Sequence, residues 1–460
     1  MTIRLLPGNG TGQPGQPIRS MLAATLVLGG GSMVTSVIGV LAAKCWALFV
    51  GPGGVGQSAL LLGISGLLGT VAGLSLANGM LRLGPELLAA SDKFAFRSLV
   101  ASAWSIWLVA SSVAIISLYA CAGLVSQWIG HHLDHRELAC LTTILGASAA
   151  TALQNGIINA THDIRRLAWS SIAGAFASLC ATVSLLALLG QEGIAPALAI
   201  GALGTWLVSW LAYRSTMRAT IGPRPHAGTS LPSSRRYVRD LCAFGVPFTA
   251  SCLLGAGIQQ LLPVIIVREL GMDQAGDYRA ASTIGIGYIG VILAALGQDF
   301  YPRIAAAKRD PIAVRRLLVR QIRFSVALLL PIIVGMILCK EWLILICYSR
   351  DFLPAASLLP WFALGSLPKV VSWCIGYTIM ATAPGWVFLI SETITGMAWL
   401  ASALTCMRWW GLDGLGVAFV VAYCTHVVLV TIILFGLKSR RPRDTAHGLA
   451  NEDLGSQPPL

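Results

Sequence analysis

One lysine interrupts a long apolar stretch of the chain. Residues 361–380, WFALGSLPKVVSWCIGYTIM, are long enough to cross a bilayer, and Lys369 carries their only charge. At a helical rise of about 1.5 Å per residue, Lys369 lies roughly 21 Å from the hairpin at 381–385. An ammonium group near mid-bilayer costs about 2.5–3.5 kcal/mol on insertion scales, so it normally faces protein or water. We therefore expect Lys369 to hold an anionic ligand; packing or snorkelling of this lysine is the alternative.

A carboxylate follows on the next apolar stretch. Glu392, within FLISETITG, lies about 13 Å from the same hairpin. Its level therefore differs from that of Lys369 by about 8 Å, which allows a direct salt bridge without requiring one. Glu392 is either the partner of a buried cation or a site that binds a proton or an ion.

Three further cations lie in or at the ends of apolar stretches. Lys44 precedes Gly51 by a few residues, Arg82 ends the second stretch, and Arg279 stands beside Asp277. Snorkelling of Lys44 and Arg82, and pairing of Arg279 with Asp277, are the structural alternatives. With Lys369, these cations predict a cavity that favours an anionic group such as phosphate or pyrophosphate.

The composition explains why these charges stand out. The chain has 460 residues, of which 56% are hydrophobic and 11% charged, whereas a soluble protein carries about 25% charged residues. This composition predicts an all-α, polytopic membrane protein. The net charge of +13 is accounted for by membrane topology, so no nucleic-acid partner is expected.

Apolar runs of about 20 residues recur along the chain and predict about twelve transmembrane helices. We place them at 21–50, 57–82, 98–124, 139–160, 168–190, 194–214, 241–267, 276–300, 324–345, 356–380, 385–407 and 414–437. Alternate loops hold most of the Lys and Arg residues, whereas the other loops hold only Arg136, Arg268, Lys340, Arg350 and Arg408. The bias predicts that both termini are cytoplasmic.

The chain also repeats itself. GPGGVGQSALL from Gly51 matches GMDQAGDYRAA from Gly271, and GQEGIAPALAI from Gly190 matches GLDGLGVAFVV from Gly411. The two offsets, 220 and 221 positions, agree and predict two pseudo-symmetric six-helix bundles with parallel topology and a cleft between them. The glycines and Pro52 of the first motif, Gly51 to Gly56, are expected to form a structural turn.

These boundaries divide the chain into five parts. They are a flexible cytoplasmic tail (1–20), an N-terminal bundle (21–214), a cytoplasmic linker (215–240), a C-terminal bundle (241–437) and a second tail (438–460).

The sequence offers no cofactor or metal site that its spacing supports. The 11 cysteines lie mostly within apolar runs without a CxxC pair. The motif HHLDH, 131–135, fits an interfacial amphipathic turn better than a metal site. Walker and HExxH motifs are absent from the sequence, and no catalytic set is evident, so we expect neither an ATPase nor an enzyme.

The order of several motifs resembles one family. AKCWALFVGPGGVGQ, the following ANGMLR, the tyrosine-proline pair before the basic loop at 301–302, the stretch around Lys369 and the acid of FLISETITG are similar to Wzx-type O-antigen and lipid III flippases. These belong to the multidrug/oligosaccharidyl-lipid/polysaccharide (MOP) superfamily. Lys44, Arg82, Lys369 and Glu392 match charged positions of the family. The family often has an acid where this chain has Ser366, which leaves Lys369 without that neighbour.

The resemblance implies a flippase that moves a polyprenyl-pyrophosphate-linked oligosaccharide across the bacterial inner membrane by alternating access, for O-antigen or exopolysaccharide synthesis. The substrate-binding candidates are Lys44, Arg82, Arg279 and Lys369. The candidates for proton or sodium coupling are Glu392, Asp299, Asp277 and Glu86. Family analogy adds membrane lipid and, as partners, a polysaccharide polymerase and a chain-length regulator.

Two other classes compete with the flippase. A MOP drug/cation antiporter would need a cavity dominated by carboxylates and aromatic rings, whereas the membrane charges of this chain are mainly cationic. A membrane-embedded polysaccharide polymerase or ligase is generally built around a large outer loop, and the largest loops here are expected to be cytoplasmic.

Overall fold

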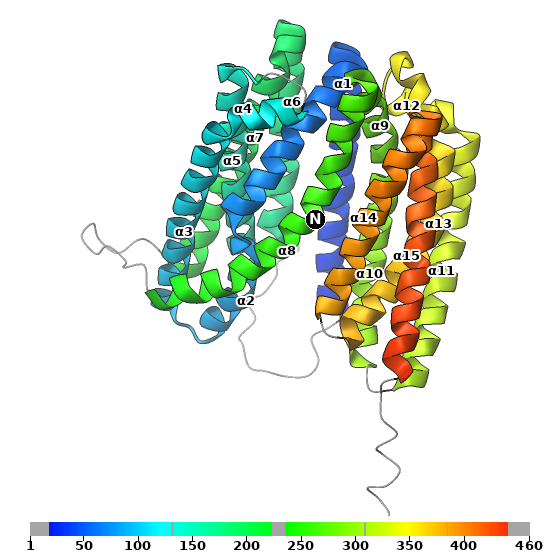
Figure 1. Ribbon diagram of the computed structural model, residues 1–460. Coiled ribbons are helices and arrows are strands. Elements are labelled where there is room, and N and C mark those ends of the chain that lie inside the picture. Colours follow the sequence, from blue (N-terminus) through cyan, green and yellow to red (C-terminus); the bar gives the residue numbers. More distant parts are fainter. Residues whose placement is uncertain (1–17, 130–132, 223–234, 308–309, 384, 440–460) are drawn as a thin grey trace, which may run out of the picture.

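In the parts that the structure describes, the chain consists of helices joined by short turns, without a strand. The computed structural model describes residues 18–129, 133–222, 235–307, 310–383 and 385–439, without the side chains of 18–29, 294–295, 298–299, 302, 385 and 436–439. Two groups of near-parallel helices stand side by side, with α1 and α8 between them (Figure 1).

The first bundle contains the helices up to α7. They are α1 (Ile18–Gly73), α2 (Leu76–Ala89), α3 (Lys93–Ala120), α4 (Ala122–Ile129), α5 (His135–Ala160), α6 (Ile164–Leu189), the 3₁₀ turn η1 (Gly190–Gly193) and α7 (Ile194–Ile221).

The second bundle contains the remaining helices. It comprises α8 (Arg235–Leu270), α9 (Met272–Ser282), the π-turn η2 (Thr283–Gly287), α10 (Tyr288–Ala306), α11 (Pro311–Leu338), α12 (Lys340–Cys347), the 3₁₀ helix η3 (Arg350–Ser357), α13 (Leu359–Thr382), α14 (Gly385–Trp410) and α15 (Asp413–Ser439).

Each expected span coincides with a helix or with consecutive helices. The first ends at the break at Gly51, the second comprises the rest of α1 and the start of α2, and the eighth combines α9, η2 and α10. By length and mean hydropathy alone, seven segments of the described chain qualify as membrane spans. Two of them, 30–89 and 164–221, have 60 and 58 residues and are each long enough for two crossings. The short helices α4 and α12 were expected only as the ends of neighbouring spans.

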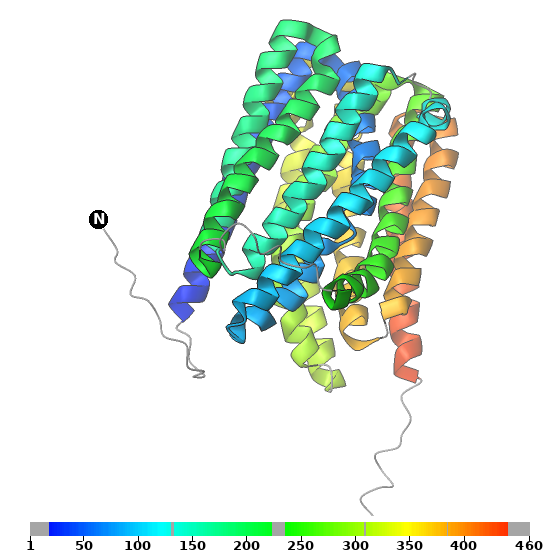
Figure 2. The ribbon, with the colours of Figure 1, turned by 90° about the vertical axis from the view of Figure 1, so that its left-hand side faces the viewer.

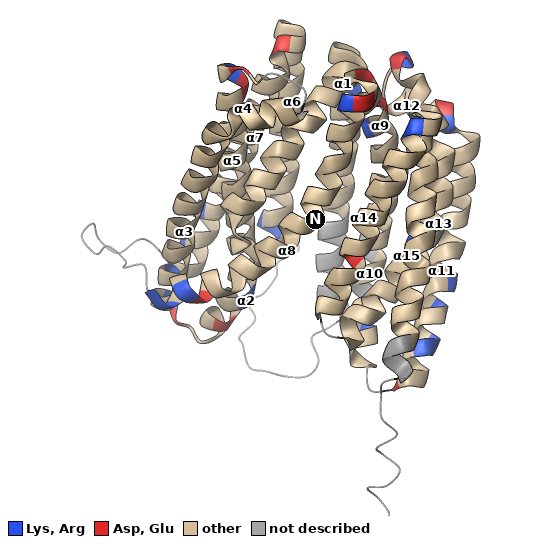
Figure 3. Ribbon diagram, viewed as in Figure 1, with Lys and Arg blue, Asp and Glu red and all other residues tan. Residues whose placement is uncertain are grey.

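Lys and Arg residues gather towards one end of both bundles (Figure 3). This end, which we call the basic end, carries the ends of α2, α5, α7 and α10 and the starts of α3, α6, α8 and α11. The other end, which carries α4, α12 and the start of α9, is called the opposite end. The assignment of the basic end to the cytoplasm stays a prediction of the positive-inside rule.

Helix α8 joins the two bundles. In its C-terminal half it contacts α14, where Gly396 lies against Ile258. Towards the basic end it crosses to the first bundle (Figure 1), where Leu241 packs against Gly79 of α2 and Gly245 packs against the carbonyl of Leu74. Pro247 and Pro263 interrupt its hydrogen-bond ladder, which permits the bending that such a crossing requires.

Glycines give the two repeats the same backbone geometry. Gly51 (φ 63°) kinks α1, and Gly271 (φ 97°) precedes α9. Gly190 and Gly411 likewise share a φ of 56°. Only glycine adopts this left-handed region readily, which explains why both motifs begin with it. The backbone at Gly51 is not helical (φ 63°, ψ −168°), so the expected turn separates two helical segments of α1.

The repeats contact each other through their second glycines. A Cβ atom on Gly56 would collide with the carbonyl oxygen of Met272, and one on Gly276 would collide with that of Pro52. Pro52 and Met272, like Gly56 and Gly276, are 220 positions apart, so the two contacts are equivalents under a pseudo-twofold axis. Small residues permit this close approach of two helices in a membrane.

Replacing Gly276 with alanine is expected to destabilise the protein by about 1–3 kcal/mol, because the new methyl group has no space against Pro52. Thermal unfolding in detergent measures the effect. Gly290→Ala on α10 is the control, since nothing lies within 4 Å of an ideal Cβ there. Equal melting temperatures for the two variants would show that the tight crossing does not contribute to stability.

Candidate functional site

Lys369 lies near the middle of α13, as its depth in the sequence predicts. Its Nζ atom stands 5.6 Å from the ring centroid of Phe419 and 5.4 Å from that of Tyr423, both on α15. Aromatic faces stabilise a cation but do not neutralise it. Ser366, at the position where the family often has an acid, donates its hydroxyl to the carbonyl of Phe362 in its own helix.

A pair of ionisable groups, Glu392 and His426, lies close by. The Oε1 atom of Glu392 on α14 is 3.8 Å from the Nε2 atom of His426 on α15. The histidine is 4% exposed, and neither ring nitrogen has a hydrogen-bond partner among the described residues. The Glu392 side chain is half exposed. A buried polar group without a partner is costly, which makes His426 a candidate functional residue.

Glu392 therefore faces His426 rather than Lys369. Among the described side chains, no carboxylate is within 4 Å of the Lys369 ammonium. Tyr423 contacts both groups, since its ring also lies 6.2 Å from that of His426. The direct salt bridge that the sequence allowed is not formed. His426 was missed because a lone histidine in an apolar helix carries no motif; its only signal was a polar ring within the run 414–437.

The first bundle has hydroxyl groups where the second has ionisable ones. At the offset of 221, Glu392 corresponds to Ser171 and His426 to Thr205. The Thr205 hydroxyl donates to the carbonyl of Gly174 on α6, so this position is satisfied in the first bundle. The helical fold therefore forms in the first bundle without ionisable groups at these positions.

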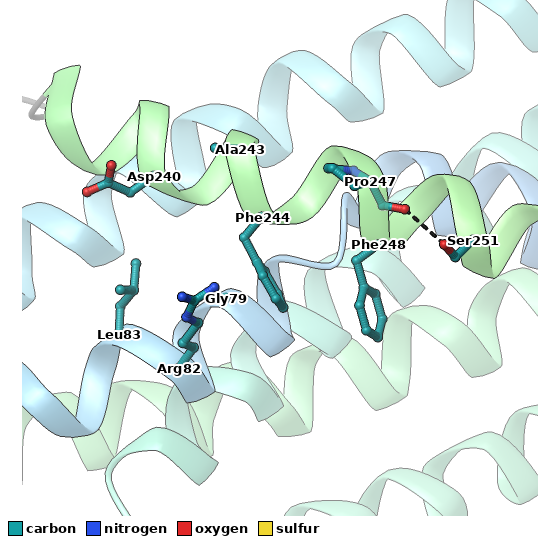
Figure 4. A pocket seen from close by; sticks show the side chains of 9 residues that line it. All are labelled: Gly79, Arg82, Leu83, Asp240, Ala243, Phe244, Pro247, Phe248 and Ser251. Atoms are coloured by element: carbon teal, nitrogen blue, oxygen red, sulfur yellow. Dashed lines mark hydrogen bonds between the residues drawn. The ribbon is translucent and has the colours of Figure 1, made fainter. Parts of the chain in front are cut away.

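Arg82 lines a separate pocket of about 600 Å³ near the basic end, between α2 and α8. Figure 4 shows its guanidinium beside the ring of Phe244, whose centroid is 5.3 Å away. Asp240 and Ser251 also line the pocket, and Asp240 is within 4 Å of two arginines that precede it on α8. The pocket combines an exposed cation with apolar rings, so it suits an amphipathic anion.

Lys44 has a different environment. Its Nζ atom donates to the carbonyl oxygen of Leu345 at 2.5 Å and also to that of Tyr348. Both carbonyls belong to the end of α12, where a helix has unpaired acceptors and a partial negative charge. Lys44 thus links α1 of the first bundle to α12 of the second.

Arg268 makes a similar contact from the second bundle to the first, although Lys44 and Arg268 are 224 positions apart and do not occupy equivalent places in the repeat. Its guanidinium, near the end of α8, donates to the carbonyl of Gln127 at the end of α4, at 2.6 Å. Gln127 and Leu345 are 218 positions apart. The same offset relates Asp92 and Asp310, whose side chains accept hydrogen bonds at the starts of α3 and α11. We call the contacts of Lys44 and Arg268 the two clasps; Arg268 was not a candidate from the sequence.

The remaining candidates do not join Lys369. Asp277 is buried in α9 with one oxygen unpaired among the described residues, whereas Arg279 is exposed. The pairing of these two residues is not formed, because positions two apart point to different sides of a helix. Glu86 is exposed on α2, and the side chain of Asp299 lies outside the described residues. Among the described residues, no cluster of three His, Cys, Asp or Glu side chains forms a metal site.

Comparisons with known proteins agree with this architecture. The polysaccharide biosynthesis protein family matches residues 86–357. The lipid III flippase of Escherichia coli (strain K12) is 22% identical over 376 residues, which cover 81% of this chain and 88% of that protein.

Solved structures share the fold. An inward-facing multidrug resistance MATE family transporter of the MOP superfamily superposes with a TM-score of 0.70 at 15% identity, covering 91% of this chain and 100% of its own. The lipid II flippase MurJ in an inward closed conformation has a TM-score of 0.69 at 13% identity, covering 90% and 87%. These matches confirm the expected helical fold of paired bundles. Because the matched family spans more than half of the sequence, the chain belongs to the polysaccharide biosynthesis protein family, with the fold of MOP-superfamily transporters.

Proposed function

We propose that the protein is a flippase that moves a polyprenyl-pyrophosphate-linked oligosaccharide from the cytoplasmic to the periplasmic leaflet of the bacterial inner membrane. One observation carries this proposal: Lys369 lies at mid-span on two aromatic rings, with no carboxylate within 4 Å among the described side chains. A cation kept at this depth without a counter-ion favours a negatively charged ligand.

Arg82 and Lys369, which form no ion pair among the described residues, suggest successive contacts for the pyrophosphate. Arg82 is exposed in its pocket at the basic end and would meet the headgroup first, while Lys369 would hold it at mid-membrane. The polyprenyl chain would remain in lipid beside the seam between α8 and α14. Lys44 already donates to two carbonyls, so we assign it to closing the opposite end rather than to binding substrate.

Alternating access would follow from rocking of the two bundles. In the proposed cycle, the reciprocal glycine contacts and both clasps would hold the opposite end closed. Opening that end would require breaking them. Any outward-open state must therefore offer other contacts to Lys44 and Arg268, or leave them to water.

Reconstitution tests the proposed activity. Purified protein in proteoliposomes should expose an inner-leaflet polyprenyl-pyrophosphate oligosaccharide to a lectin or glycosidase added outside. The control lipid is the same oligosaccharide on a neutral diacylglycerol. Transport of a cationic dye instead would favour a drug antiporter, and lengthening of the glycan would favour a polymerase. Association with a polymerase and a chain-length regulator is part of the proposal for cells that make such a glycan.

We further propose that Glu392 and His426 bind the coupling ion, and that this ion is a proton. A carboxylate beside a buried imidazole can take up and release a proton inside the bundle, whereas the first bundle has only hydroxyls at these positions. Sodium is the alternative, and it would require further oxygen ligands around Glu392.

Glu392→Gln is expected to abolish stimulation of transport by an imposed pH gradient while leaving transport without the gradient nearly unchanged, because the amide cannot exchange a proton at neutral pH. Initial rates in the same proteoliposomes, with and without the gradient, measure the effect. Ser171→Ala, at the equivalent position of the first bundle, should behave as wild type. Retained stimulation in Glu392→Gln, or stimulation by sodium alone, would contradict proton coupling at this pair.

A further inference from the structure

A groove on the first bundle plays no part in the proposed transport path. It has a volume of about 510 Å³ and lies between α3 and α7, over α5. These helices form the face of the first bundle that is turned away from the second bundle (Figures 1 and 2). The floor consists of small residues, among them Gly146, above which nothing lies within 4 Å of an ideal Cβ.

Five aromatic side chains form the walls of this groove. Trp104 packs edge-on against Trp107, with ring centroids 5.2 Å apart, and its Nε1 atom donates to the Tyr213 hydroxyl at 3.3 Å. On α7, Trp206 and Trp210 stack at 6.4 Å. The rings hold one another in place, so the groove is preformed rather than a gap left by mobile side chains.

The groove ends at a cation. The guanidinium of Arg214 stands 4.5 Å from the ring centroid of Trp210. Arg214 lies one turn closer to the basic end and is exposed, and the ion pairs found among the described residues do not include it. An apolar channel at membrane depth that leads to a fixed cation near the membrane surface matches a lipid with an anionic headgroup.

The second bundle lacks these features. At the repeat offsets of 218 and 221, the five aromatic positions correspond to Ile322, Ser325, Val427, Thr431 and Leu434. The helical fold is therefore formed without any aromatic ring at these places. The tryptophans and the tyrosine are a property of the first bundle alone, as expected for a ligand site and not for a requirement of packing.

We propose that this groove binds one anionic phospholipid of the leaflet at the basic end, with an acyl chain among the tryptophans and the phosphate on Arg214. The site faces away from the seam between the bundles, so its occupant is a resident lipid and not the transported substrate. A glycerophospholipid with a net negative charge, such as phosphatidylglycerol, satisfies both the aromatic walls and the cation.

Native mass spectrometry of the purified protein with added phosphatidylglycerol or phosphatidylethanolamine tests the proposal. One phosphatidylglycerol should be retained at roughly tenfold higher affinity than phosphatidylethanolamine. Gly146→Leu fills the floor, where there is space for a side chain, and should abolish the retained lipid. Arg214→Gln should remove the preference for the anionic lipid while leaving weak binding of both.

Matched variants in the second bundle provide the controls. Gly335→Leu also extends a side chain into open space, and Arg320→Gln removes another exposed arginine. Both should retain phosphatidylglycerol as wild type does. Unchanged retention in Gly146→Leu, or equal affinity for the two lipids in wild type, would overturn the proposal. Release of a co-purified membrane protein by Gly146→Leu, with lipid unaffected, would also overturn it. None of these readouts depends on flippase activity.

Discussion

Replacing Lys369 with methionine is expected to abolish glycan export while the protein stays folded and abundant in the membrane. Methionine preserves an unbranched apolar stem against Phe419 and Tyr423 but removes the ammonium. A lost hydrogen bond to a charged group is worth about 1.5–3 kcal/mol, so binding of the headgroup should weaken about 10- to 100-fold. Arginine restores the charge and should rescue export in part.

Complementation of a flippase-deficient strain that makes the matching glycan measures this effect at equal protein abundance. Surface glycan should disappear in Lys369→Met, while the lipid-linked precursor accumulates on the cytoplasmic side. The control is Lys340→Met, which removes a lysine at the start of α12. Full export by Lys369→Met would show that the charge is dispensable and that the lysine serves packing alone.

Removing both clasps together is expected to open the opposite end. Lys44→Ala and Arg268→Ala each leave the end of a short helix without its charged donor, and the double variant removes both links between the bundles at these helices. Arg268 is exposed, so its contact is worth less than that of Lys44. A combined shift of about 1.4 kcal/mol would raise the population of the open state tenfold.

Thiol labelling follows the opening directly. In a background without the natural cysteines, Ala275→Cys places a thiol that is buried at the contact between the bundles, where the alanine is 4% exposed. An impermeant maleimide added at the opposite end should react several-fold faster in the double variant than in the parent. Arg350→Ala, which removes an exposed arginine from η3 at the same end, is the control. Equal labelling rates would show that the clasps do not govern closure.

The fold could be predicted from the sequence because membrane insertion restricts the solutions. Apolar runs of span length must be helices, and the matching glycines from Gly51 and Gly271 mark the repeat by their spacing alone. The reciprocal packing of Gly56 and Gly276 could not be predicted, since it depends on the angle at which α1 and α9 cross. The hydropathy of α8 likewise could not predict that this helix contacts both bundles.

The sequence predicted those residues of the candidate site that are recognisable by their charge alone. Lys369 and Glu392 stood out because ionisable groups are rare in apolar helices. Arg268 and the role of Lys44 were missed because their partners are backbone carbonyls of α4 and α12. A pattern of side chains in the sequence does not indicate such contacts. His426 was overlooked for a similar reason: its importance comes from its burial beside Glu392.

The reciprocal glycine contact also has an evolutionary consequence. Two copies of a six-helix protein that met through such glycines would form an isologous homodimer. In such a dimer every contact between the subunits occurs twice, related by a twofold axis. In such a homodimer, any new charge would appear twice. A single chain is free of that constraint: Thr205 of the first bundle corresponds to His426 of the second, and the tryptophans of the groove have no aromatic counterparts. Because both halves belong to one chain, each can carry residues that the other lacks.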